Sequence, residues 1–475
     1  MSSSTPRILY IAYACEPHRG SEWGLAWNFV AEQSRTSEVW VIAHEDNRAA
    51  LEPYLQAKHK GHPIHVTYVK LPAIFAWMRN ASYAMLNVHY YLWQFAAARA
   101  ARRLHAQVHF DVVQHLSYCR WWMPSAGGTL ATRGAKWVFG PIAGGDLVPE
   151  QFRKSFPPAA QKEEKRRRFA RDFWRRDPLL KRCVRNAAVV IPSTPLAERG
   201  LRELGARRVE VFPCVSLGDP EQLEAARAAR AQRQPSDKLR LVAVGGVTHY
   251  RGIDLTLRAI AKAKLESVEY IHACGGVELD NMKKLAEQLG ITHQVTWLGE
   301  TDQATNVSVT ASADAFIHCT LRDNQGLVLN ALALGIPTIV FDHNSSALMV
   351  GEGCGHRLKI DDTVTPEQAV DEMAGVLRTW HDNRGLLTAM APACIAHAQT
   401  FSHRARGDWF RKLYANLSRP PRSRPPVGSA LPPPRRPSTA GLLHLSRPRL
   451  LDGVLRNKSP GLVASQQVSS MSHVV

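Results

Sequence analysis

Short apolar runs alternate with amphipathic stretches along most of the chain. In the first half, apolar runs predict strands at residues 7–14, 38–44, 64–71, 108–116, 136–139 and 187–192. The amphipathic stretches between these runs predict helices. Strands that alternate with helices favour βαβ units and a parallel sheet. We therefore predict a first Rossmann-like α/β domain over residues 1–217.

The same alternation begins again beyond residue 237. Strands are predicted at residues 238–244, 268–273, 294–298, 315–319 and 337–341, with helices at residues 254–264, 281–289 and 326–334. They indicate a second Rossmann-like domain over residues 218–400, whose first 20 residues form a polar linker or surface helix. An amphipathic helix at residues 401–417 is expected to pack back on the first domain. Residues 418–475, rich in proline and arginine, predict a disordered tail.

The charge of the chain favours an anionic partner. The 475 residues carry a formal net charge of +19, of which the segment from Ser418 to Val475 supplies +8. Such an excess suits nucleotide phosphates, nucleic acid or an acidic lipid surface. The sequence contains no zinc finger, basic leucine zipper or aromatic RNA-binding signature, so nucleic acid is not an expected partner.

The cysteines and the apolar stretches predict a cytoplasmic protein. The eight cysteines include no C-x-x-C pair, which argues against a zinc site and a disulfide scaffold and favours reduced thiols. A strand-like run follows Arg7 directly, so no signal peptide is predicted. The most apolar stretch, residues 84–98, is interrupted by Asn87, His89 and Gln94 and is too short to span a membrane.

Several segments, taken in order, resemble glycosyltransferase family 4 enzymes of GT-B fold. They are residues 14–27, 140–145, 245–254, 297–299 and 329–342. The resemblance covers roughly residues 7–417, and its specificity comes from the order and spacing of the segments. It implies two Rossmann-like domains facing each other across a cleft, and a retaining transferase that moves a sugar from a nucleotide sugar to a glycan or lipid-linked acceptor. Cell-surface or exopolysaccharide synthesis is the implied setting, with no further cofactor.

The chain contains no Asp-x-Asp motif, which some sugar transferases use to hold a metal ion against the donor diphosphate. The expected alternative is metal-independent: basic side chains, backbone N–H groups and helix N-termini neutralise the leaving diphosphate. Arg251 is the best basic candidate. The family usually places an arginine and a lysine five residues apart at this point, whereas this chain has Gly246 and Arg251. The competing interpretation is a solvated loop arginine.

Two positions in the first half match the family pattern. Gly20 lies where a strand gives way to a helix, and the resemblance implies that its backbone approaches the donor phosphate. An ordinary turn glycine is the alternative. His115 ends a predicted strand where family members place a histidine beneath the sugar. Gln114 or Ser117 facing the pocket, or a structural histidine, remain alternatives.

The block from Arg322 to Asn330 resembles the donor-binding turn of the family. There, two acidic residues with seven between them hold the transferred sugar and the nucleotide ribose. Asp323 matches the first acid, Asn330 replaces the second, and the interval is one residue short. The resemblance also assigns phosphate-binding N–H groups to Gly326, Leu327 and Val328. It assigns a loop bordering the base to Gly275. A plain helix start capped by Asp323 or Asn324 is the alternative.

Basic and aromatic residues alternate between Lys162 and Arg182. Bulky side chains beside cations at near-helical spacing suit an interfacial helix on an acidic membrane, here the inner face of the plasma membrane. A solvated charged face is the bland alternative. The aromatic stretch at residues 74–95 either cooperates with this helix or belongs to the core.

Three other functions compete with an active transferase. A catalytically weakened homologue that acts as a scaffold or partner is suggested by Gly246, by Asn330 and by the shortened interval. A sugar-nucleotide epimerase needs additional carboxylates that the sequence does not place. An NAD dehydrogenase is disfavoured because no G-x-G-x-x-G motif follows either first strand.

Overall fold

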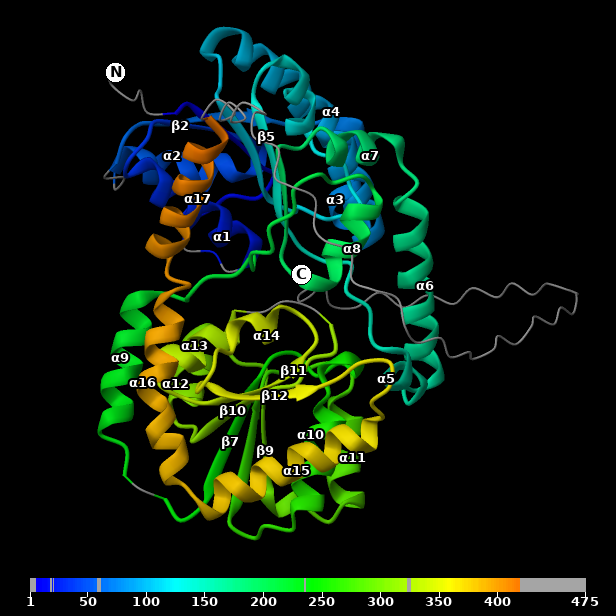
Figure 1. Cartoon of the computed structure of the whole chain (residues 1–475), viewed down its shortest axis with the longest axis vertical. Helices are drawn as coiled ribbons and strands as arrows, with labels where there is room; N and C mark the ends of the chain where they lie inside the picture. The colour runs from blue at the N-terminus through cyan, green and yellow to red at the C-terminus, as the bar shows by residue number, and fades with distance from the viewer. Residues whose placement is uncertain are drawn as a thin grey trace, which may run out of the picture. The chain divides into compact units, whose positions relative to one another are not determined.

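A computed structural model describes residues 6–17, 19, 21–57, 61–234, 236–322 and 326–418 (Figure 1). Gly20, Asp323 and the predicted disordered tail at residues 419–475 lie outside the described residues. The described chain forms two six-stranded sheets, in which all paired strands run parallel. The expected pair of Rossmann-like α/β sheets is therefore confirmed.

The first sheet has the strand order β3-β2-β1-β4-β5-β6. Its strands are β1 (Ile8–Ala12), β2 (Val39–His44), β3 (Ile64–Val69), β4 (Val112–Ser117), β5 (Lys136–Ile142) and β6 (Val189–Pro192). The helices of this half are α1 (Ser21–Ser34), α2 (Arg48–Ala57), α3 (Met78–Ala81), α4 (Tyr83–Val108), α5 (Glu150–Lys154), α6 (Pro158–Trp174), α7 (Pro178–Arg185) and α8 (Pro195–Glu203). The strand order reverses between β1 and β4, the place where ligands bind in open α/β sheets.

The second sheet has the order β12-β11-β10-β7-β8-β9 and reverses between β7 and β10. Its strands are β7 (Leu239–Val244), β8 (Val268–Ala273), β9 (Val295–Gly299), β10 (Ala315–His318), β11 (Thr338–Asp342) and β12 (Gly355–Lys359). The helices are α9 (Pro220–Ala231), α10 (Ile253–Ala263), α11 (Leu279–Gln288), α12 (Gln303–Ala311), α13 (Leu327–Ala333), α14 (Ser345–Met349), α15 (Pro366–Asp382), α16 (Gly385–Gln399) and α17 (His403–Ser418).

Burial on both faces explains why the strands are continuous apolar runs. All five residues of β1 are buried. Leu9 and Ile11 belong to one hydrophobic cluster and Ile8 and Tyr10 to another, so each face of the sheet has its own core. Helix α17 supplies Phe410, Leu413 and Tyr414 to the second of these clusters. The last described helix therefore packs against the first sheet.

The structure corrects two details of the sequence prediction and decides a third. The strand expected at residues 108–116 begins at Val112, because α4 continues through Val108 and ends at His109, which has a left-handed φ of 54°. The polar segment expected as linker or surface helix contains the helix α9, of which only Leu223 is buried. The basic segment expected as one helix is divided into α6 and α7, which begins at Pro178, and proline cannot continue a preceding helix.

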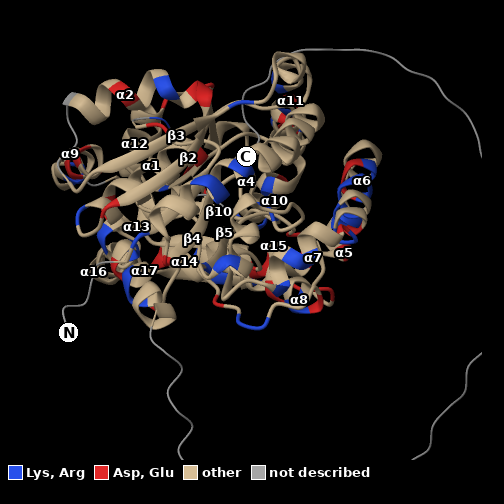
Figure 2. Ribbon diagram, turned by 90° about the horizontal axis from the view of Figure 1, so that it is seen from above, with Lys and Arg blue, Asp and Glu red and all other residues tan. Residues whose placement is uncertain are grey.

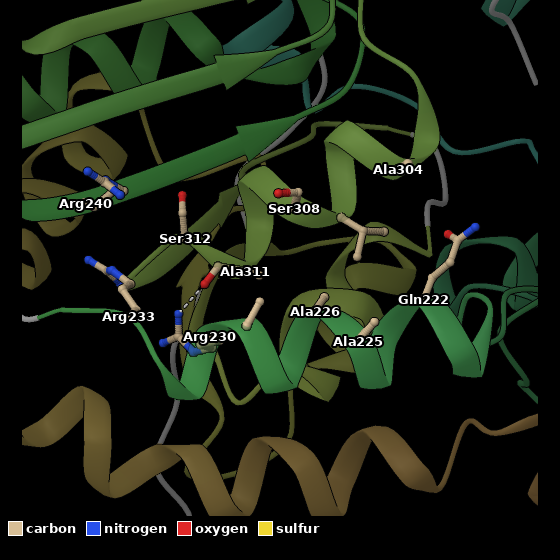
Figure 3. A pocket seen from close by; sticks show the side chains of 12 residues that line it. Gln222, Ala225, Ala226, Arg230, Arg233, Arg240, Ala304, Ser308, Ala311 and Ser312 are labelled. Atoms are coloured by element: carbon tan, nitrogen blue, oxygen red, sulfur yellow. Dashed lines mark hydrogen bonds between the residues drawn. The ribbon is translucent and has the colours of Figure 1, made fainter.

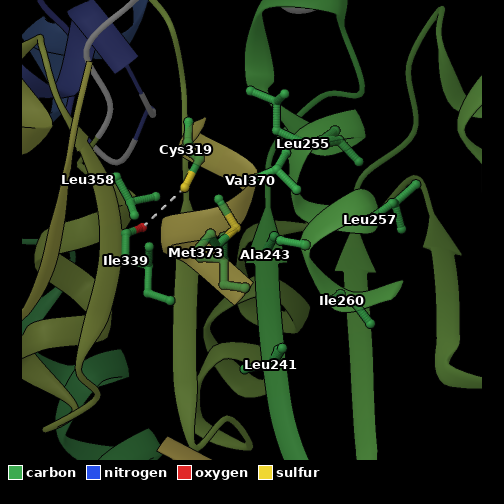
Figure 4. Packing of buried hydrophobic residues seen from close by; sticks show 14 of the residues in the cluster. Leu241, Ala243, Leu255, Leu257, Ile260, Cys319, Ile339, Leu358, Val370 and Met373 are labelled. Atoms are coloured by element: carbon green, nitrogen blue, oxygen red, sulfur yellow. Dashed lines mark hydrogen bonds between the residues drawn. The ribbon is translucent and has the colours of Figure 1, made fainter. Parts of the chain in front are cut away.

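The core of the second sheet also takes in a segment of the first half. Val148, Phe152, Phe156 and Ala160 share one hydrophobic cluster with the strands and with α10 and α15. The Phe152 and Phe341 rings are 5.9 Å apart, edge to face. Figure 4 shows part of this cluster, with side chains of α10 and α15 against β7, β11 and β12. The two halves of the sequence thus share a core.

No helix in the described part of the chain is long and apolar enough to cross a membrane. Six of the eight cysteines are buried, and Cys214 and Cys274 are half-buried.

Candidate functional site

The loops that follow β7 and β10 meet at the reversal point of the second sheet. After β7 the chain forms a short 3-10 turn, His249–Arg251, and after β10 it continues from Cys319 to Arg322. The Leu321 N–H donates to the Tyr250 carbonyl oxygen at 2.8 Å. Gly252 has a φ of 63°, and a Cβ at this position would lie 2.3 Å from the Cys319 carbonyl oxygen. Glycine therefore permits the two loops to touch through their backbones.

Arg251 carries a buried charge in this turn. Its Nε and Nη1 atoms are buried and have no hydrogen-bond partner among the described residues. Burial lowers the pKa of His318, at the end of β10, to about 3, and the nearby Arg251 charge contributes. The pKa of His272 in β8 is lowered to about 4, mainly by burial, with a smaller contribution from Arg251. A guanidinium that has two unpaired donors near neutral imidazoles is suited to receive an anion.

The two histidines differ in their bonding. His272 lies 2.9 Å from the Gly245 carbonyl oxygen through Nε2 and 3.0 Å from the Tyr270 hydroxyl through Nδ1. It therefore fixes the backbone immediately before Gly246. His318 stacks on Phe316, and its Nε2 has no partner among the residues that the structure describes.

The glycine loops after β7 and β8 pack closely against each other. The Val247 N–H donates to the Gly275 carbonyl oxygen at 2.8 Å. A Cβ on Gly276 would lie 2.4 Å from the Val247 nitrogen, and a Cβ on Gly275 would lie 2.5 Å from Glu300 Oε1. The structure thus brings Gly275 next to Gly246, in the loop that leads to Arg251.

Asn330 forms a backbone contact at the start of the second half. Asn330 lies one turn into α13, and its Oδ1 accepts the Gly218 N–H at 2.9 Å. A Cβ on Gly326, the residue before α13, would lie 3.2 Å from the Ser216 carbonyl oxygen. The chain that joins the two halves therefore lies against Gly326, Leu327 and Asn330. The ribose and phosphate contacts expected for these residues and for Val328 stay predictions.

A buried ion pair connects α6 with both loops. Glu164 is 2% exposed and accepts from Arg322 Nε at 3.0 Å, while His249 Nε2 lies 3.0 Å from the same oxygen. Arg322 also stacks on Tyr250, with Cζ 3.6 Å from the ring centre. Burial acts to raise the pKa of Glu164, but the His249 hydrogen bond and the Arg322 charge outweigh it, so the pKa lies below its usual value. The sequence pattern of this segment predicts an interfacial helix or a solvated charged face, and does not predict that Glu164 is buried.

Three groups in the described residues lie close enough to share a metal ion: Glu163, Glu164 and His249, with ligand atoms within 4.8 Å of one another. Arg322 Nη2 also lies 3.5 Å from Glu163 Oε1. The guanidinium of Arg322 thus already pairs with both carboxylates.

The first sheet holds His115 in its interior. His115 is 1% exposed, and its Nε2 lies 2.8 Å from both the Tyr90 hydroxyl and the Ser117 carbonyl oxygen. Its Nδ1 has no partner in the part of the chain described, and burial lowers its pKa to about 4. His115 is thus a neutral histidine in the core, and its predicted contact with the sugar stays a prediction.

Glu22 lies at the point where the strand order of the first sheet reverses. It lies in the first turn of α1, and its Oε2 accepts the Tyr118 N–H at 2.9 Å, just beyond β4. Burial raises the pKa of this carboxyl, against the lowering effects of the Tyr118 hydrogen bond and the Arg120 charge.

A separate pocket of about 440 Å³ lies between α9 and α12 (Figure 3). Its arginines are all engaged: Arg230 with the Ala311 carbonyl oxygen, Arg233 with Asp314 and Arg240 with Glu269, each at 2.8 Å. None of the predicted site residues lines it. This pocket is therefore distinct from the Arg251 site.

Comparisons with known proteins agree with this architecture. Residues 226–391 match the family model described as "Glycosyl transferases group 1". D-inositol 3-phosphate glycosyltransferase of Mycolicibacterium paratuberculosis is 32% identical over 205 residues, which cover 42% of this chain and 44% of that protein. The match thus spans less than half the length of that relative.

Solved structures resemble nearly all of the described chain. HepE of Anabaena, solved in complex with UDP, has a TM-score of 0.54 at 15% identity and covers 86% of this chain and 100% of its own. The N-terminal domain of trehalose-6-phosphate phosphatase of Candida albicans has a TM-score of 0.56 at 13% identity, with 87% and 97% covered. At such identities the likeness concerns the fold alone. Together with the two sheets, it confirms the expected GT-B class.

Proposed function

We propose that the protein transfers a sugar from a nucleotide diphosphate donor to an acceptor, because residues 226–391 match the family model of the group 1 glycosyl transferases. The single observation that carries this proposal is the half-buried Arg251 guanidinium, whose Nε and Nη1 atoms are buried and unpaired in the described structure. A leaving diphosphate supplies the missing acceptors, and its charge increases as the bond to the sugar breaks. Fixed donors aimed at developing charge accelerate such a reaction.

The rest of the donor site follows from the family resemblance. Gly275 borders the base, the N–H groups of Gly326, Leu327 and Val328 face the phosphates, and Asn330 reaches the ribose. Asp323 and His115 orient the sugar, with Gly20 against the donor phosphate. The transfer retains the anomeric configuration, with the leaving phosphate assisting on the same face. It is metal-independent, because the sequence contains no Asp-x-Asp motif.

Nucleotide binding tests the proposal directly. UDP, GDP and ADP are titrated separately while thermal unfolding is followed. At least one of them is expected to raise the melting temperature of the wild type, and Arg251→Gln is expected to remove most of that shift. Hydrolysis of a panel of nucleotide sugars then identifies the donor. If none of the three nucleotides shifts the melting temperature, the scaffold hypothesis replaces the transferase.

A second part of the proposal concerns the membrane. Phe169 and Phe173 on α6 are 73% and 57% exposed. Cations alternate with these rings, and the ribbon of α6 in Figure 2 is coloured for basic and acidic residues along its length. Exposed aromatic rings beside cations bind the interface of an anionic bilayer. We therefore place the protein at the inner face of the plasma membrane, with a glycan or lipid-linked acceptor used in cell-surface polysaccharide synthesis.

The aromatic patch extends from α6 to α4. The Trp174 and Tyr91 rings are 5.9 Å apart, and Tyr91 is followed at 5.7 Å by Phe95, which is 53% exposed. Vesicle co-sedimentation with and without phosphatidylglycerol tests the patch. The double variant Phe169→Ser, Phe173→Ser is expected to lose binding to the anionic vesicles. Val277→Ser, at an exposed apolar position of the second half, is the matched control, and equal losses in both would reject the patch.

A further inference from the structure

A small cavity of about 200 Å³ lies at the carboxyl edge of the first sheet. Trp121 lines it from the loop after β4, and Gly145 lines it from the loop after β5. Helix α8, which begins just after β6, forms another wall, and α6 supplies Arg171 and Arg175. Carboxyl edges of parallel strands are where α/β domains bind ligands.

The cavity carries an excess of positive charge. Its lining holds three arginines, Arg171, Arg175 and Arg199, against a single carboxylate, Glu203. That carboxylate serves both Arg175 and Arg199, the latter at 3.3 Å. Arg171 bonds the Gly145 carbonyl oxygen at 3.3 Å and also Asp172, which does not line the cavity. Even with Asp172 counted, cations remain in excess.

A buried donor without an acceptor lies in the same cavity wall. Trp121 is 3% exposed, and its indole Nε1 has no hydrogen-bond partner in the described residues. The guanidinium carbons of Arg171 and Arg175 are 5.8 and 5.4 Å from the centre of its ring. A Cβ on Gly145 would lie 1.7 Å from Nε1, so only glycine fits against this nitrogen. Burying an indole N–H without an acceptor is costly.

We infer that this cavity binds a phosphate group of the acceptor. The inference rests on the proposed function, because a transferase of this architecture needs an acceptor opposite the donor site. Two guanidinium forks and one indole N–H can together serve several oxygens of a single phosphate. The phosphate belongs either to a soluble phosphate ester or to a lipid headgroup. Since α6 also carries Phe169 and Phe173, the lipid source has a neighbouring surface on which its chains can lie.

The first experiment observes Trp121 directly. The full chain is labelled with 5-fluorotryptophan, the Trp121 signal is assigned from Trp121→Phe, and inorganic phosphate is titrated. The signal is expected to shift saturably in the wild type. Arg171→Gln and Arg175→Gln are each expected to weaken phosphate binding by about ten- to a hundredfold, the loss of one charge-assisted bond. Arg166→Gln, an equal charge change at an exposed position of α6, should bind as the wild type does.

Two outcomes would overturn the inference. One is a Trp121 signal that does not move with inorganic phosphate up to about 10 mM, a concentration that half-fills a site even at a Kd of about 10 mM. The other is an equal response in Arg166→Gln and Arg171→Gln, which reduces the effect to general surface charge. Binding of UDP is measured in the same samples. Arg171→Gln should leave the affinity for UDP unchanged. The phosphate inference can therefore fail while the donor site binds UDP, and the donor site can fail while the cavity binds phosphate.

The source of the phosphate is decided by two further titrations. Glycerol 3-phosphate represents a soluble ester, and phosphatidate in phosphatidylcholine vesicles represents a lipid headgroup. If phosphatidate shifts the Trp121 signal and Phe169→Ser, Phe173→Ser removes this shift, the acceptor is lipid-linked. If glycerol 3-phosphate alone shifts the signal, the acceptor is a soluble phosphate ester. If neither does, the cavity does not bind phosphate esters and the inference is wrong.

Discussion

Replacing Arg251 by glutamine is expected to change two properties in opposite directions. In the nucleotide-free protein, the substitution removes a charge whose Nε and Nη1 atoms are buried without partners in the described structure. In the proposed nucleotide complex, it removes the donors assigned to the diphosphate. The variant should therefore be more stable than the wild type without nucleotide, and bind nucleotide less tightly.

The magnitudes follow from the two unpaired atoms. A charge-assisted hydrogen bond contributes about 1.5–3 kcal/mol, so losing two weakens binding by about 3 kcal/mol or more, at least a hundredfold in Kd. Leaving a buried donor unpaired costs about 1–3 kcal/mol, so its removal should stabilise the free protein by about 1 kcal/mol. For the second half, predicted at residues 218–400, a gain of about 1 kcal/mol raises the melting temperature by about 2–4 °C.

Differential scanning calorimetry at several nucleotide concentrations measures both effects in one series. The rise in melting temperature without nucleotide gives the first, and the dependence on nucleotide concentration gives Kd. Arg258→Gln is the matched control, because Arg258 is an exposed arginine of α10, the helix that follows the same turn. The reasoning is refuted if Arg251→Gln lowers the melting temperature of the free protein and leaves the nucleotide-induced rise intact, since Arg251 is then structural.

Three further substitutions test the support of the site. Glu164→Gln breaks the buried pair with Arg322 and should cost about 3–5 kcal/mol in the free energy of unfolding, measured with urea. Because the pKa of Glu164 is lowered, the stability from this pair is present above about pH 4.5 and lost on acidification. A variant as stable as the wild type at neutral pH would contradict this stabilising role. Burial lowers the pKa of His272 to about 4, so wild-type stability should fall from about pH 6.5 downward, and His272→Gln should flatten that fall by about 1.4 kcal/mol per pH unit; parallel curves contradict this. Gly252→Ala, at a φ of 63° against Cys319, should cost about 1–3 kcal/mol, and an unchanged melting temperature would show that the turn adapts.

Most of the fold was predictable because its strands are buried on both faces. Such strands are uninterrupted apolar runs, and β1 and β7 were recognised within a few residues. Strand β12 was not predicted, because it lies at the edge of its sheet and its residues Gly355–Lys359 include three polar or charged side chains. Its pairing with β11 depends on backbone bonds that no hydrophobic pattern records.

The candidate site was predictable only in part. Arg251 was proposed from the family resemblance, which places a basic pair just after the strand that opens the second half, and that position is a local property of the sequence. Glu164 was not, because its partner Arg322 is 158 residues away and nothing in the charge run between Lys162 and Arg182 distinguishes a buried carboxylate from solvated ones. Likewise, the sequence leaves open which side of its strand His115 faces, whereas the structure places it against Tyr90.

The segment from Val148 to Ala160 has a consequence for dissecting the molecule. Its apolar side chains complete the hydrophobic cluster beneath the second sheet, although they precede that sheet by some 80 residues. A recombinant fragment cut at residue 218, or at the limits of the family match, would expose Phe341 and its neighbours to water and should aggregate. Supplying residues 146–160 as a separate peptide should restore its solubility. An exchange of donor halves between related transferases must accordingly carry this segment along, so the unit that can be inherited or transplanted is discontinuous in sequence.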